Sequence, residues 1–517
     1  MSTTVQLSSS DDFVAAVTRA ASSSTSTTLV LLPGTYTLPR SGMHIMGTKS
    51  LRIVATSSAD ASQRVLIVSS LAAEENEALI KASNGAQVVF ENVHFRFGAF
   101  QKDEDEYDEE PEQDQDQDAV IEASGQGTVM HLIGCSVNGV GCHGVVAKIG
   151  AVVMLNKTHI GAEIEEDEDE VMMPLAGILV LSGARVTMED KTIVCRARWS
   201  GAWVRGGTLE ARGGCEFKYN GGPAINVDMA KSTVKVEDAI IQGNDVAIVA
   251  GAPSSTYMFA HTTFVDNERY GAIIGGRGRA ANKARPVFSD CTFKANGESG
   301  AVVVEGASAS FERCGFVANG RLSGSGIELH SAQAVAFDGC VFEGNKTHGV
   351  QASEGSRATL RQCTLKGNAA AGAVIEDAGS VVVLLATVAV ANKNGLVVCK
   401  GASVQTNESR FNDNIGSGIR VENEGRVQID DCKLAGNKVF GLYVVSAVAS
   451  IAYSVVESNG TAGISGGWEA SLSVGAGNRI SASPTALVVS DLATRCHVSA
   501  DSVLDGLVKC AAVLASS

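Results

Sequence analysis

The sequence predicts an all-β solenoid, a parallel β-helix in which the chain winds through about 15–18 short coils. Three observations predict this fold class. The 517 residues include 56 Gly, only 8 Pro and 5% aromatic residues, a composition that favours short strands and tight turns. An Asn recurs at intervals of 22 to 29 residues through the second half of the chain. No segment within a repeat is long enough for a helix with a period of 3.6 residues.

The repeat has a frame of about 23 residues, C-x-F-x-x-N, then a short turn, then G-φ-x-V. Its clearest marker is the Asn column, which consists of Asn220, Asn244, Asn267, Asn296, Asn319, Asn345, Asn368, Asn392, Asn414, Asn437 and Asn459. A coil of this length holds two or three apolar stretches of three to five residues. We therefore expect three short strands per coil, with successive coils about 4.8 Å apart.

Each column of the repeat becomes a stack of side chains. The position two residues after Cys predicts an interior apolar ladder, Phe217, Ile241, Phe264, Phe293, Phe316, Phe342, Leu365, Ala389, Phe411, Leu434 and Val456. The Asn position requires a residue that tolerates left-handed backbone at a corner and whose amide bonds its neighbours. The Cys column is expected to face inward as reduced thiols, because superposed Cβ atoms at strand spacing do not suit a disulfide.

The two ends of the chain predict caps on the solenoid. Residues 1–26 include SSDDFVAAVTRAA, in which Ser and Asp are candidate N-caps and Phe13, Ala16, Val17 and Ala20 share one helical face. Residues 27–498 form the predicted β-helix, with acidic insertions at 102–118 and 163–170 and a basic insertion at 275–286. Residues 499–517 form the second cap, with a closing helix expected after Asp501.

These segments resemble a known superfamily. DDFVAAVTRAA followed by TLVLLPGTYTL resembles the opening of pectin-lyase-like right-handed β-helix proteins, in which a capping helix leads to the first strand. The N-x-x-x-G-φ-x-V repeat is similar to the β-helix regions of mannuronan epimerases and of F-box only proteins. The resemblance implies a single right-handed parallel β-helix with helical caps. It implies little about function, because the fold hosts lyases, hydrolases, epimerases, adhesins and adaptors.

The net charge of −16 comes from two acidic runs. Asp103–Asp118 holds eleven carboxylates and Glu163–Glu170 holds seven, and without them 39 acidic residues face 41 Lys and Arg. No clustered basic surface is evident, which disfavours nucleic acid as a general partner. The chain has no apolar run of about 20 residues to cross a membrane. Because the N-terminus lacks the basic and apolar regions of a secretory signal, we expect a cytoplasmic or nuclear protein.

Both acidic runs replace the turn that carries Asn in other coils, in coils that are two apart. They should therefore leave the same edge of the solenoid about 10 Å apart, and we call this the acidic edge. Its candidate binding residues are Asp103, Glu104, Asp105, Glu106, Asp108, Glu109, Glu110, Glu165, Glu166, Asp167, Glu168 and Asp169. Arg196 and Arg198 occupy the equivalent turn of the next coil beside Trp199, and Arg with exposed Trp is typical of interface hot spots. Trp203 is expected to pack inward.

The acidic runs allow several interpretations. They can be solvated insertions, which surface turns tolerate easily. They can be a docking surface for a protein partner with a basic segment, because merged charge steers association. They can bind divalent metal, although no register fixes the ligands. Catalysis has the least support, because a solvated carboxylate lacks a tuned pKa. We therefore predict an interaction scaffold that has no cofactor or metal.

The alternative is a carbohydrate-active enzyme with a non-standard site. The site motifs of the polysaccharide-active β-helices that the chain resembles are missing. A polygalacturonase-like site needs an Asp pair beside other motifs on neighbouring coils, and the only Asp pairs here are Asp11–Asp12 and Asp430–Asp431. The D-P-H motif of the epimerases is absent. His143 and His348 each precede the Gly of a coil without a carboxylate pair at matching positions. A column of turn acids, Glu305, Glu354, Asp377 and Glu422, is interrupted by Lys400 and continued by Asn423 and Ser446. Such a mixed column predicts a solvated turn, and it is where a carbohydrate site would lie.

Overall fold

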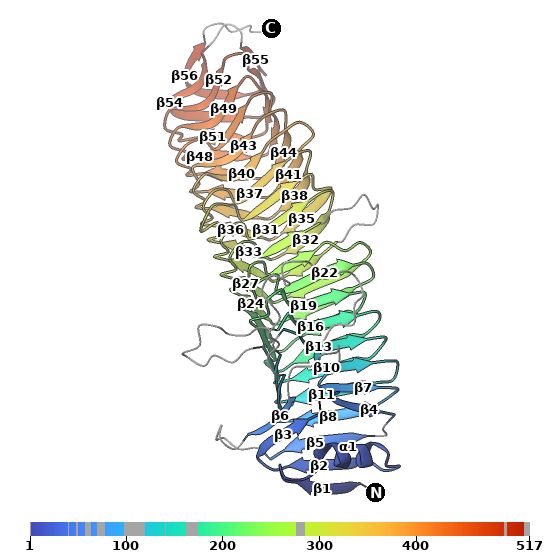
Figure 1. Ribbon diagram of the computed structural model, residues 1–517. Coiled ribbons are helices and arrows are strands. Elements are labelled where there is room, and N and C mark those ends of the chain that lie inside the picture. Colours follow the sequence, from blue (N-terminus) through green and yellow to red (C-terminus); the bar gives the residue numbers. More distant parts are fainter. Residues whose placement is uncertain are drawn as a thin grey trace. The chain divides into compact units, whose positions relative to one another are not determined.

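The computed structural model describes residues 2–39, 41–47, 50–56, 64–69, 78–97, 119–139, 141–161, 174–275, 285–490 and 494–510. These residues form two compact units, Met1–Met258 and Phe259–Ser517, and the division falls within β26 (Thr256–Ala260). In each unit the strands stack in parallel, coil upon coil (Figure 1). The predicted fold class, a parallel β-helix, is confirmed.

Unit 1 has three parallel sheets, and from β2 onward each coil contributes one strand to each of them. The first sheet contains β1 (Thr3–Leu7), β2 (Thr27–Leu31), β5 (Leu51–Ala55), β8 (Gln87–Glu91), β11 (Val129–Ile133), β14 (Val152–Asn156), β17 (Arg185–Glu189), β20 (Thr208–Ala211) and β23 (Thr233–Glu237). The second contains β3 (Gly34–Leu38), β6 (Val65–Ser69), β9 (His94–Arg96), β12 (Ser136–Asn138), β15 (His159–Ile160), β18 (Ile193–Cys195), β21 (Glu216–Lys218) and β24 (Ile240–Gln242). The third contains β4 (Met43–Met46), β7 (Ile80–Ser83), β10 (Ala119–Ser124), β13 (His143–Lys148), β16 (Ala176–Leu181), β19 (Ser200–Arg205), β22 (Ile225–Met229) and β25 (Ile248–Ala250).

Unit 2 repeats this arrangement. Its first sheet contains β29 (Val287–Ser289), β32 (Ser308–Glu312), β35 (Ala334–Asp338), β38 (Arg357–Arg361), β41 (Val381–Leu385), β44 (Ser403–Asn407), β47 (Arg426–Asp430), β50 (Val448–Ala452), β53 (Ser471–Val474) and β55 (Arg495–Val498). The second contains β27 (Thr263–Val265), β30 (Thr292–Lys294), β33 (Gly315–Val317), β36 (Val341–Glu343), β39 (Thr364–Lys366), β42 (Val388–Val390), β45 (Arg410–Asn412), β48 (Lys433–Ala435) and β51 (Val455–Glu457). The third contains β28 (Ala272–Ile274), β31 (Ala301–Val304), β34 (Ile327–His330), β37 (Val350–Ser353), β40 (Ala371–Ile375), β43 (Asn394–Val398), β46 (Ile419–Glu422), β49 (Phe440–Val445) and β52 (Ala462–Gly467). The long strand β54 (Arg479–Val489) pairs with both β51 and β52.

The helical cap is present at the N-terminal end. Helix α1 (Phe13–Ala21) begins after Asp12, whose Oδ1 accepts a hydrogen bond of 2.9 Å from the Ala15 N–H. The face predicted from the sequence is buried, and the Phe13 ring meets Tyr36 edge to face with centroids 5.4 Å apart. Among the described residues, no helix has the length and apolar character needed to cross a membrane.

The closing helix expected after Asp501 is wrong. Residues 503–510 form strand β56 (Val503–Cys510), which pairs in parallel with β54. The free edge of β54 supplies backbone partners for an incoming strand, and Gly506 is a poor helix former. Residues 511–517 lie outside the described part of the chain.

The interior of unit 2 is built from stacked aromatic rings. In the second sheet Phe293, Phe316 and Phe342 lie on successive coils with ring centroids 4.8 Å apart. Rings of the first sheet meet this stack edge to face, as for Phe311 and Phe316 at 5.4 Å. All members of the predicted apolar ladder are buried, and the described Cys residues are free thiols. Successive coils therefore bury the same column positions, as the repeat predicts.

The Asn column forms a buried hydrogen-bonded ladder. The Nδ2 of Asn345 donates to the Oδ1 of Asn368 in the next coil at 2.9 Å and to the Phe316 carbonyl at 3.0 Å. The prediction that Asn itself adopts left-handed backbone is wrong: positive φ falls on the preceding residue, for example Ala295 (φ 54) and Ala318 (φ 54). The corner before Asn turns its amide inward, where it satisfies backbone groups that water cannot reach.

A column of Gly lies beside the Asn ladder at the start of each strand of the third sheet. A Cβ at Gly349 would lie 2.6 Å from the Gly372 carbonyl oxygen and 3.1 Å from the Asn368 Nδ2. The same clash with the next coil recurs at Gly300, Gly326, Gly372, Gly395, Gly418 and Gly441. The Gly of the G-φ-x-V motif is therefore required by the close approach of neighbouring coils.

Candidate functional site

The described surface carries a polar network on the outward side of the third sheet in unit 2. In β34 the side chains of Ile327 and Leu329 are buried, whereas Glu328 and His330 point outward and are partly exposed. We call this network the polar face, and it consists of Ser299, Ser325, Glu328, His330, Thr347, Gln351, Ser353, Glu376 and Lys400. Strand alternation places the members on one side of the sheet or in the turns beside it.

The network begins at Ser299, in the turn before β31. The Ser299 hydroxyl donates to the Glu328 Oε1 at 2.6 Å and accepts the Ser325 N–H at 2.8 Å. The Ser325 hydroxyl lies 2.9 Å from the Thr347 hydroxyl and 3.5 Å from the Gln351 Oε1. These contacts connect three successive coils through side chains, in addition to the backbone ladder.

The network continues through Gln351 to the next two coils. The Gln351 Nε2 donates to the Glu376 Oε1 at 3.0 Å, and the Lys400 Nζ donates to the Glu376 Oε2 at 2.6 Å. The strand register agrees with this series of hydrogen bonds, because Gln351 lies beside Val374 and His330 lies beside Ser353 in the paired strands. Hydroxyl, amide, carboxylate and ammonium groups therefore follow one another across the coils.

His330 joins the network through a carboxylate and a hydroxyl. Its Nε2 lies 3.5 Å from the Glu328 Oε2, and its Nδ1 lies 3.0 Å from the Ser353 Oγ and 3.9 Å from the Glu354 Oε1. The hydrogen bond with Glu328 raises the pKa of His330, and the charge of Glu354 adds to this effect although burial opposes it. His330 is therefore charged over a wider pH range than a free histidine.

The two central carboxylates of the polar face are ionised and paired. Burial acts to raise the pKa of Glu328, but hydrogen bonds from His330 and Ser299 hold it below the usual value. The hydrogen bond from Lys400 lowers the pKa of Glu376. Glu328 pairs with His330 and Glu376 with Lys400, so the charges at the centre of the polar face are balanced. A ligand there would be recognised mainly through hydrogen bonds.

The two histidines singled out in the sequence have different environments. His143 in unit 1 is fully buried, its Nδ1 accepts the Ala176 N–H at 3.2 Å, and burial lowers its pKa to about 4. His348 in unit 2 accepts the Ala371 N–H at 3.2 Å, and burial lowers its pKa. His143 belongs to the core, whereas His348 borders the polar face at the start of β37.

The turn-acid column predicted from the sequence borders the polar face. Positive φ angles at Glu305 (52), Glu354 (56), Asp377 (71) and Lys400 (52) show that this column is a left-handed turn position. Glu354 accepts a hydrogen bond of 3.2 Å from Ser331 and approaches His330, while Lys400 pairs with Glu376. The shared backbone conformation of the turn therefore defines this column. Two of its members, Glu354 and Lys400, also contact the polar face.

Sequence reasoning missed Glu328, His330 and Glu376, which carry most of the contacts. Glu328 occupies the x position of G-φ-x-V, where several neighbouring coils have Val, as at Val302 and Val374. Polar residues at this outward position in consecutive coils are the signal that could have identified the site.

Most of the acidic-edge residues lie outside the described part of the chain. This applies to Asp103, Glu104, Asp105, Glu106, Asp108, Glu109, Glu110, Glu165, Glu166, Asp167, Glu168 and Asp169. In the sequence the first run lies between β9 and β10, and the second between β15 and β16. In the second sheet, β12 pairs with both β9 and β15, so the strands that precede the two runs lie two strands apart.

Arg196, Arg198 and Trp199 occupy the equivalent turn between β18 and β19, as predicted. Arg196 has a φ of 53, and its N–H bonds the Lys218 carbonyl. The Arg198 N–H donates to the Pro174 carbonyl at 2.7 Å and the Trp199 N–H to the Leu175 carbonyl at 2.8 Å. This turn is therefore tied to the residues that follow the second acidic run. Arg198 is exposed, and Arg196 and Trp199 are half-buried.

The expected inward orientation of Trp203 is wrong. Ala202 and Val204 point into the core of unit 1, so strand alternation directs Trp203 outward. Its ring packs on Leu179, and the Arg205 guanidinium lies 5.0 Å from the ring centroid. Among the described residues, no group of three or more His, Cys, Asp or Glu side chains is arranged to hold a metal ion.

The family model described as the right handed beta helix region matches residues 214–337, 254–409 and 302–474, which together cover half of the chain. The chain belongs to the right-handed β-helix family. A search of curated proteins finds no significant match to this β-helix chain.

Several solved structures are similar to the chain. The A-module of mannuronan C-5 epimerase AlgE6 from Azotobacter vinelandii shares 10% identity with a TM-score of 0.41, over 77% of this chain and 92% of that one. The catalytic domain of a GH87 α-1,3-glucanase shares 12% identity with a TM-score of 0.31, over 79% and 65%. The periplasmic alginate epimerase AlgG shares 11% identity with a TM-score of 0.26, over 84% and 77%.

Proposed function

We propose that this β-helix is a binding scaffold whose polar face holds an elongated, uncharged ligand rich in hydroxyl groups, an oligosaccharide in chemical class. The observation that carries the proposal is the side-chain network from Ser299 to Lys400, which repeats donors and acceptors across successive coils. A ligand with hydroxyl groups at regular intervals can bond several coils at once. Coils about 4.8 Å apart provide such a periodic array.

The charge of the polar face favours a neutral ligand. Glu328 pairs with His330, and Glu376 pairs with Lys400, so the ion pairs are complete without a ligand. A phosphate-rich polymer would meet carboxylates in place of a basic surface. Ser299, Ser325 and Ser353 are buried and hold the network in place. The partly exposed Thr347 hydroxyl and Gln351 amide remain as the main uncharged recognition groups, as in sites that fix ligand orientation through a few polar groups.

Binding has more support than catalysis. A general acid and a general base with separated pKa values must both reach the reacting atoms. His330 and His348 have pKa shifts of opposite sign. However, His330 lies in register with Ser353 at the end of β37, whereas His348 lies in the turn before β37 and accepts the Ala371 N–H, so the two rings belong to opposite ends of this strand. A carbohydrate-active enzyme remains the alternative, and the test below distinguishes it.

The test is a neutral oligosaccharide array followed by titration calorimetry of the best ligand. A chain with Gln351→Ala and Glu376→Gln should bind at least tenfold more weakly than the wild type, because two linked hydrogen-bonding groups are removed. Gln428→Ala is the matched control, since Gln428 is an exposed amide on β47 of the first sheet. Equal loss in the control, or no ligand on the array, would contradict the proposal. Mass spectrometry of the incubated ligand reveals any product, which would favour the enzyme.

The acidic edge supports a second function, docking of a partner with a basic segment. Two observations favour it: β9 and β15, which precede the acidic runs in the sequence, lie two strands apart, and the turn with Arg196, Arg198 and Trp199 bonds Pro174 and Leu175, which follow the second run. Merged negative charge increases the rate of association with a basic surface. Such a partner is consistent with a cytoplasmic or nuclear scaffold.

Fluorescence anisotropy with a labelled lysine-rich peptide tests this second function. Deletion of residues 103–118 and 163–170 should abolish binding and its dependence on ionic strength. Deletion of residues 276–284, which hold Arg277, Arg279 and Lys283 of the basic insertion, is the control and should leave binding intact. Unchanged binding after the acidic deletions would exclude the acidic edge as the docking surface.

A further inference from the structure

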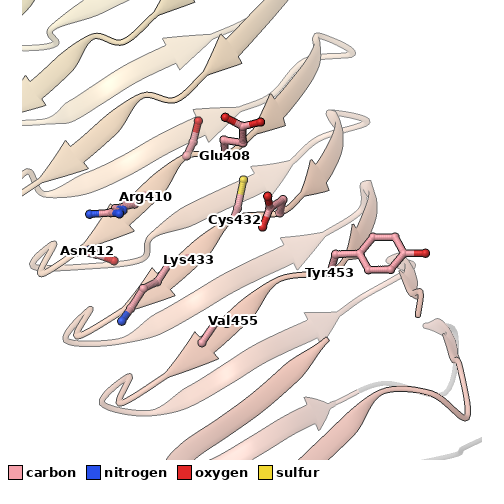
Figure 2. A pocket seen from close by; sticks show the side chains of 9 residues that line it. Glu408, Arg410, Asn412, Cys432, Lys433, Tyr453 and Val455 are labelled. Carbon is pink, nitrogen blue, oxygen red and sulfur yellow. The ribbon is translucent and has the colours of Figure 1, made fainter. Parts of the chain in front are cut away.

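A groove outside the polar face lies on the corner between the first and second sheets of unit 2. It has a volume of about 620 Å³, which lies within the usual range for small-ligand sites. Its lining residues are Glu408, Ser409, Arg410, Asn412, Asp431, Cys432, Lys433, Tyr453 and Val455. Figure 2 shows that they come from neighbouring coils, with Glu408 and Tyr453 on the corner and Arg410 and Lys433 on the strands.

The corner presents two carboxylates that lack a cation. Glu408, Asp431 and Tyr453 have φ angles of 52, 48 and 50, and they precede β45, β48 and β51 by the same interval. They therefore occupy one turn position on successive coils, about 4.8 Å apart. Within the described residues, neither carboxylate forms a hydrogen bond or ion pair. Like charges at this separation repel each other.

The same turn position shows elsewhere how a cation fits between coils. Asp290 and Arg313 occupy it with φ angles of 54 and 51. The Arg313 Nε and Nη2 donate to the two carboxylate oxygens of Asp290, both at 2.8 Å. A guanidinium thus satisfies a carboxylate of this column in a bidentate pair, the geometry that such groups prefer. Among the described residues, no guanidinium or ammonium group pairs with Glu408 or Asp431 in this way.

An aromatic ring lines the groove on the coil that follows the acidic pair. Tyr453 is 62% exposed, yet its ring lies against Gly477, where a Cβ would be only 2.5 Å from the Tyr453 Cδ1. The absence of a side chain at Gly477 lets the ring rest on the next coil. An aromatic face held in this way attracts a cation within about 6 Å.

Basic side chains form the other side of the groove. Arg410 and Lys433 lie in register on β45 and β48, two residues after the acids. Lys433 pairs with Glu457 at 2.7 Å, while Arg410 has no ion pair among the described residues. The groove therefore has a negative side at the corner and a positive side on the strands. This charge separation fits a ligand that carries both signs.

We propose that this groove binds a basic amino acid group with a free carboxylate. Its guanidinium or ammonium lies between Glu408 and Asp431 beside the Tyr453 ring, and its carboxylate pairs with Arg410. A free basic amino acid and the C-terminal residue of a peptide present the same chemistry. This inference concerns a different surface from the polar face and stands independently of the function proposed there.

Titration calorimetry of the full chain tests the proposal with L-arginine, the peptide Gly-Gly-Arg and its C-terminal amide. At least one of the two carboxylate ligands should bind saturably below about 10 mM, and the tighter one identifies the source. Combining Glu408→Gln with Asp431→Asn should weaken that binding roughly tenfold or more. Both residues are exposed, and Asn suits positive φ, so the variant should remain folded. Glu424→Gln, an exposed turn acid elsewhere in unit 2, is the control.

Arg410→Gln tests the carboxylate contact separately. The wild type should prefer Gly-Gly-Arg to its amide, and this preference should disappear in the variant. The proposal is overturned if no ligand binds saturably, if the double variant binds as well as the control, or if acid and amide bind equally to the wild type. Circular dichroism of each variant establishes that a loss of binding is not a loss of fold.

Discussion

Replacement of one ladder residue, Asn345→Ala, should destabilise unit 2 severely. The Asn345 Oδ1 accepts the Asn319 N–H at 3.0 Å, and its Nδ2 donates to the Phe316 carbonyl at 3.0 Å. Both partners are buried backbone groups with no route to water in the folded coil. The Oδ1 of Asn368 keeps a donor in the variant, because it also accepts the Asn345 N–H at 3.1 Å. The Asn319 N–H is therefore left unsatisfied, at about 1–3 kcal/mol, and the Phe316 carbonyl keeps its ladder bond to β36 but loses its second donor, at about 1 kcal/mol, or about 2–4 kcal/mol in total.

The matched control is Asn407→Ala, because Asn407 is exposed on β44. Its removal should change the free energy of unfolding by less than about 0.5 kcal/mol. Urea denaturation followed by circular dichroism gives the global change, and hydrogen exchange of peptides spanning residues 316–368 localises it. The reasoning is refuted if the two variants unfold within about 0.5 kcal/mol of each other, or if exchange increases only outside these coils.

Three other predictions test the packing and electrostatics. Gly349→Ala should lower the urea midpoint far more than Gly344→Ala, because a Cβ at Gly349 meets the next coil at 2.6 Å whereas Gly344 has open space and only a positive φ of 65. The raised pKa of His330 contributes stability that is complete below its unfolded pKa of about 6.5 and is lost as pH rises through the folded value. The stability difference between wild type and His330→Gln should therefore be larger at pH 6 than at pH 9 in paired denaturation series; a larger difference at pH 9 would reverse the assigned sign. Burial raises the pKa of Cys135 to about 12 and of Cys215 to about 11, so mass spectrometry should find both unalkylated by iodoacetamide at pH 8 until urea is added. Rapid alkylation of either thiol in the folded chain would contradict the described burial.

The repeat could be predicted because its columns have strict chemical demands. Only Asn supplies both a donor and an acceptor at a buried corner, and only Gly fits where coils approach closely, so both recur visibly. The left-handed residue before Asn could not be located, because Tyr219, Ala295 and Ser458 all adopt it and share no side-chain chemistry. The position is Gly before Asn244, Asn345, Asn368 and Asn437, so the corner leaves only a partial residue signature.

The polar face was harder to predict than the core. Its partners are separated by 23 to 29 residues, as in Gln351 with Glu376 and Ser299 with Glu328, and they meet only once the register between coils is known. The orientation of Trp203 depended on the register of β19 in the same way. The segment of strand β56 was predicted to be a helix because its apolar residues fit both the helical period of 3.6 residues and the strand period of 2. Only its pairing with β54 decides between helix and strand.

Hydrogen exchange of the full chain with and without the oligosaccharide selected on the array tests the proposed function most directly. The polar face predicts slower exchange in peptides that cover the turns and strands around Ser325–His330 and Thr347–Ser353, with no change on β44 and β47. Protection confined to other sheets, or no protection at a saturating ligand concentration, would contradict the proposal that this face is the binding surface.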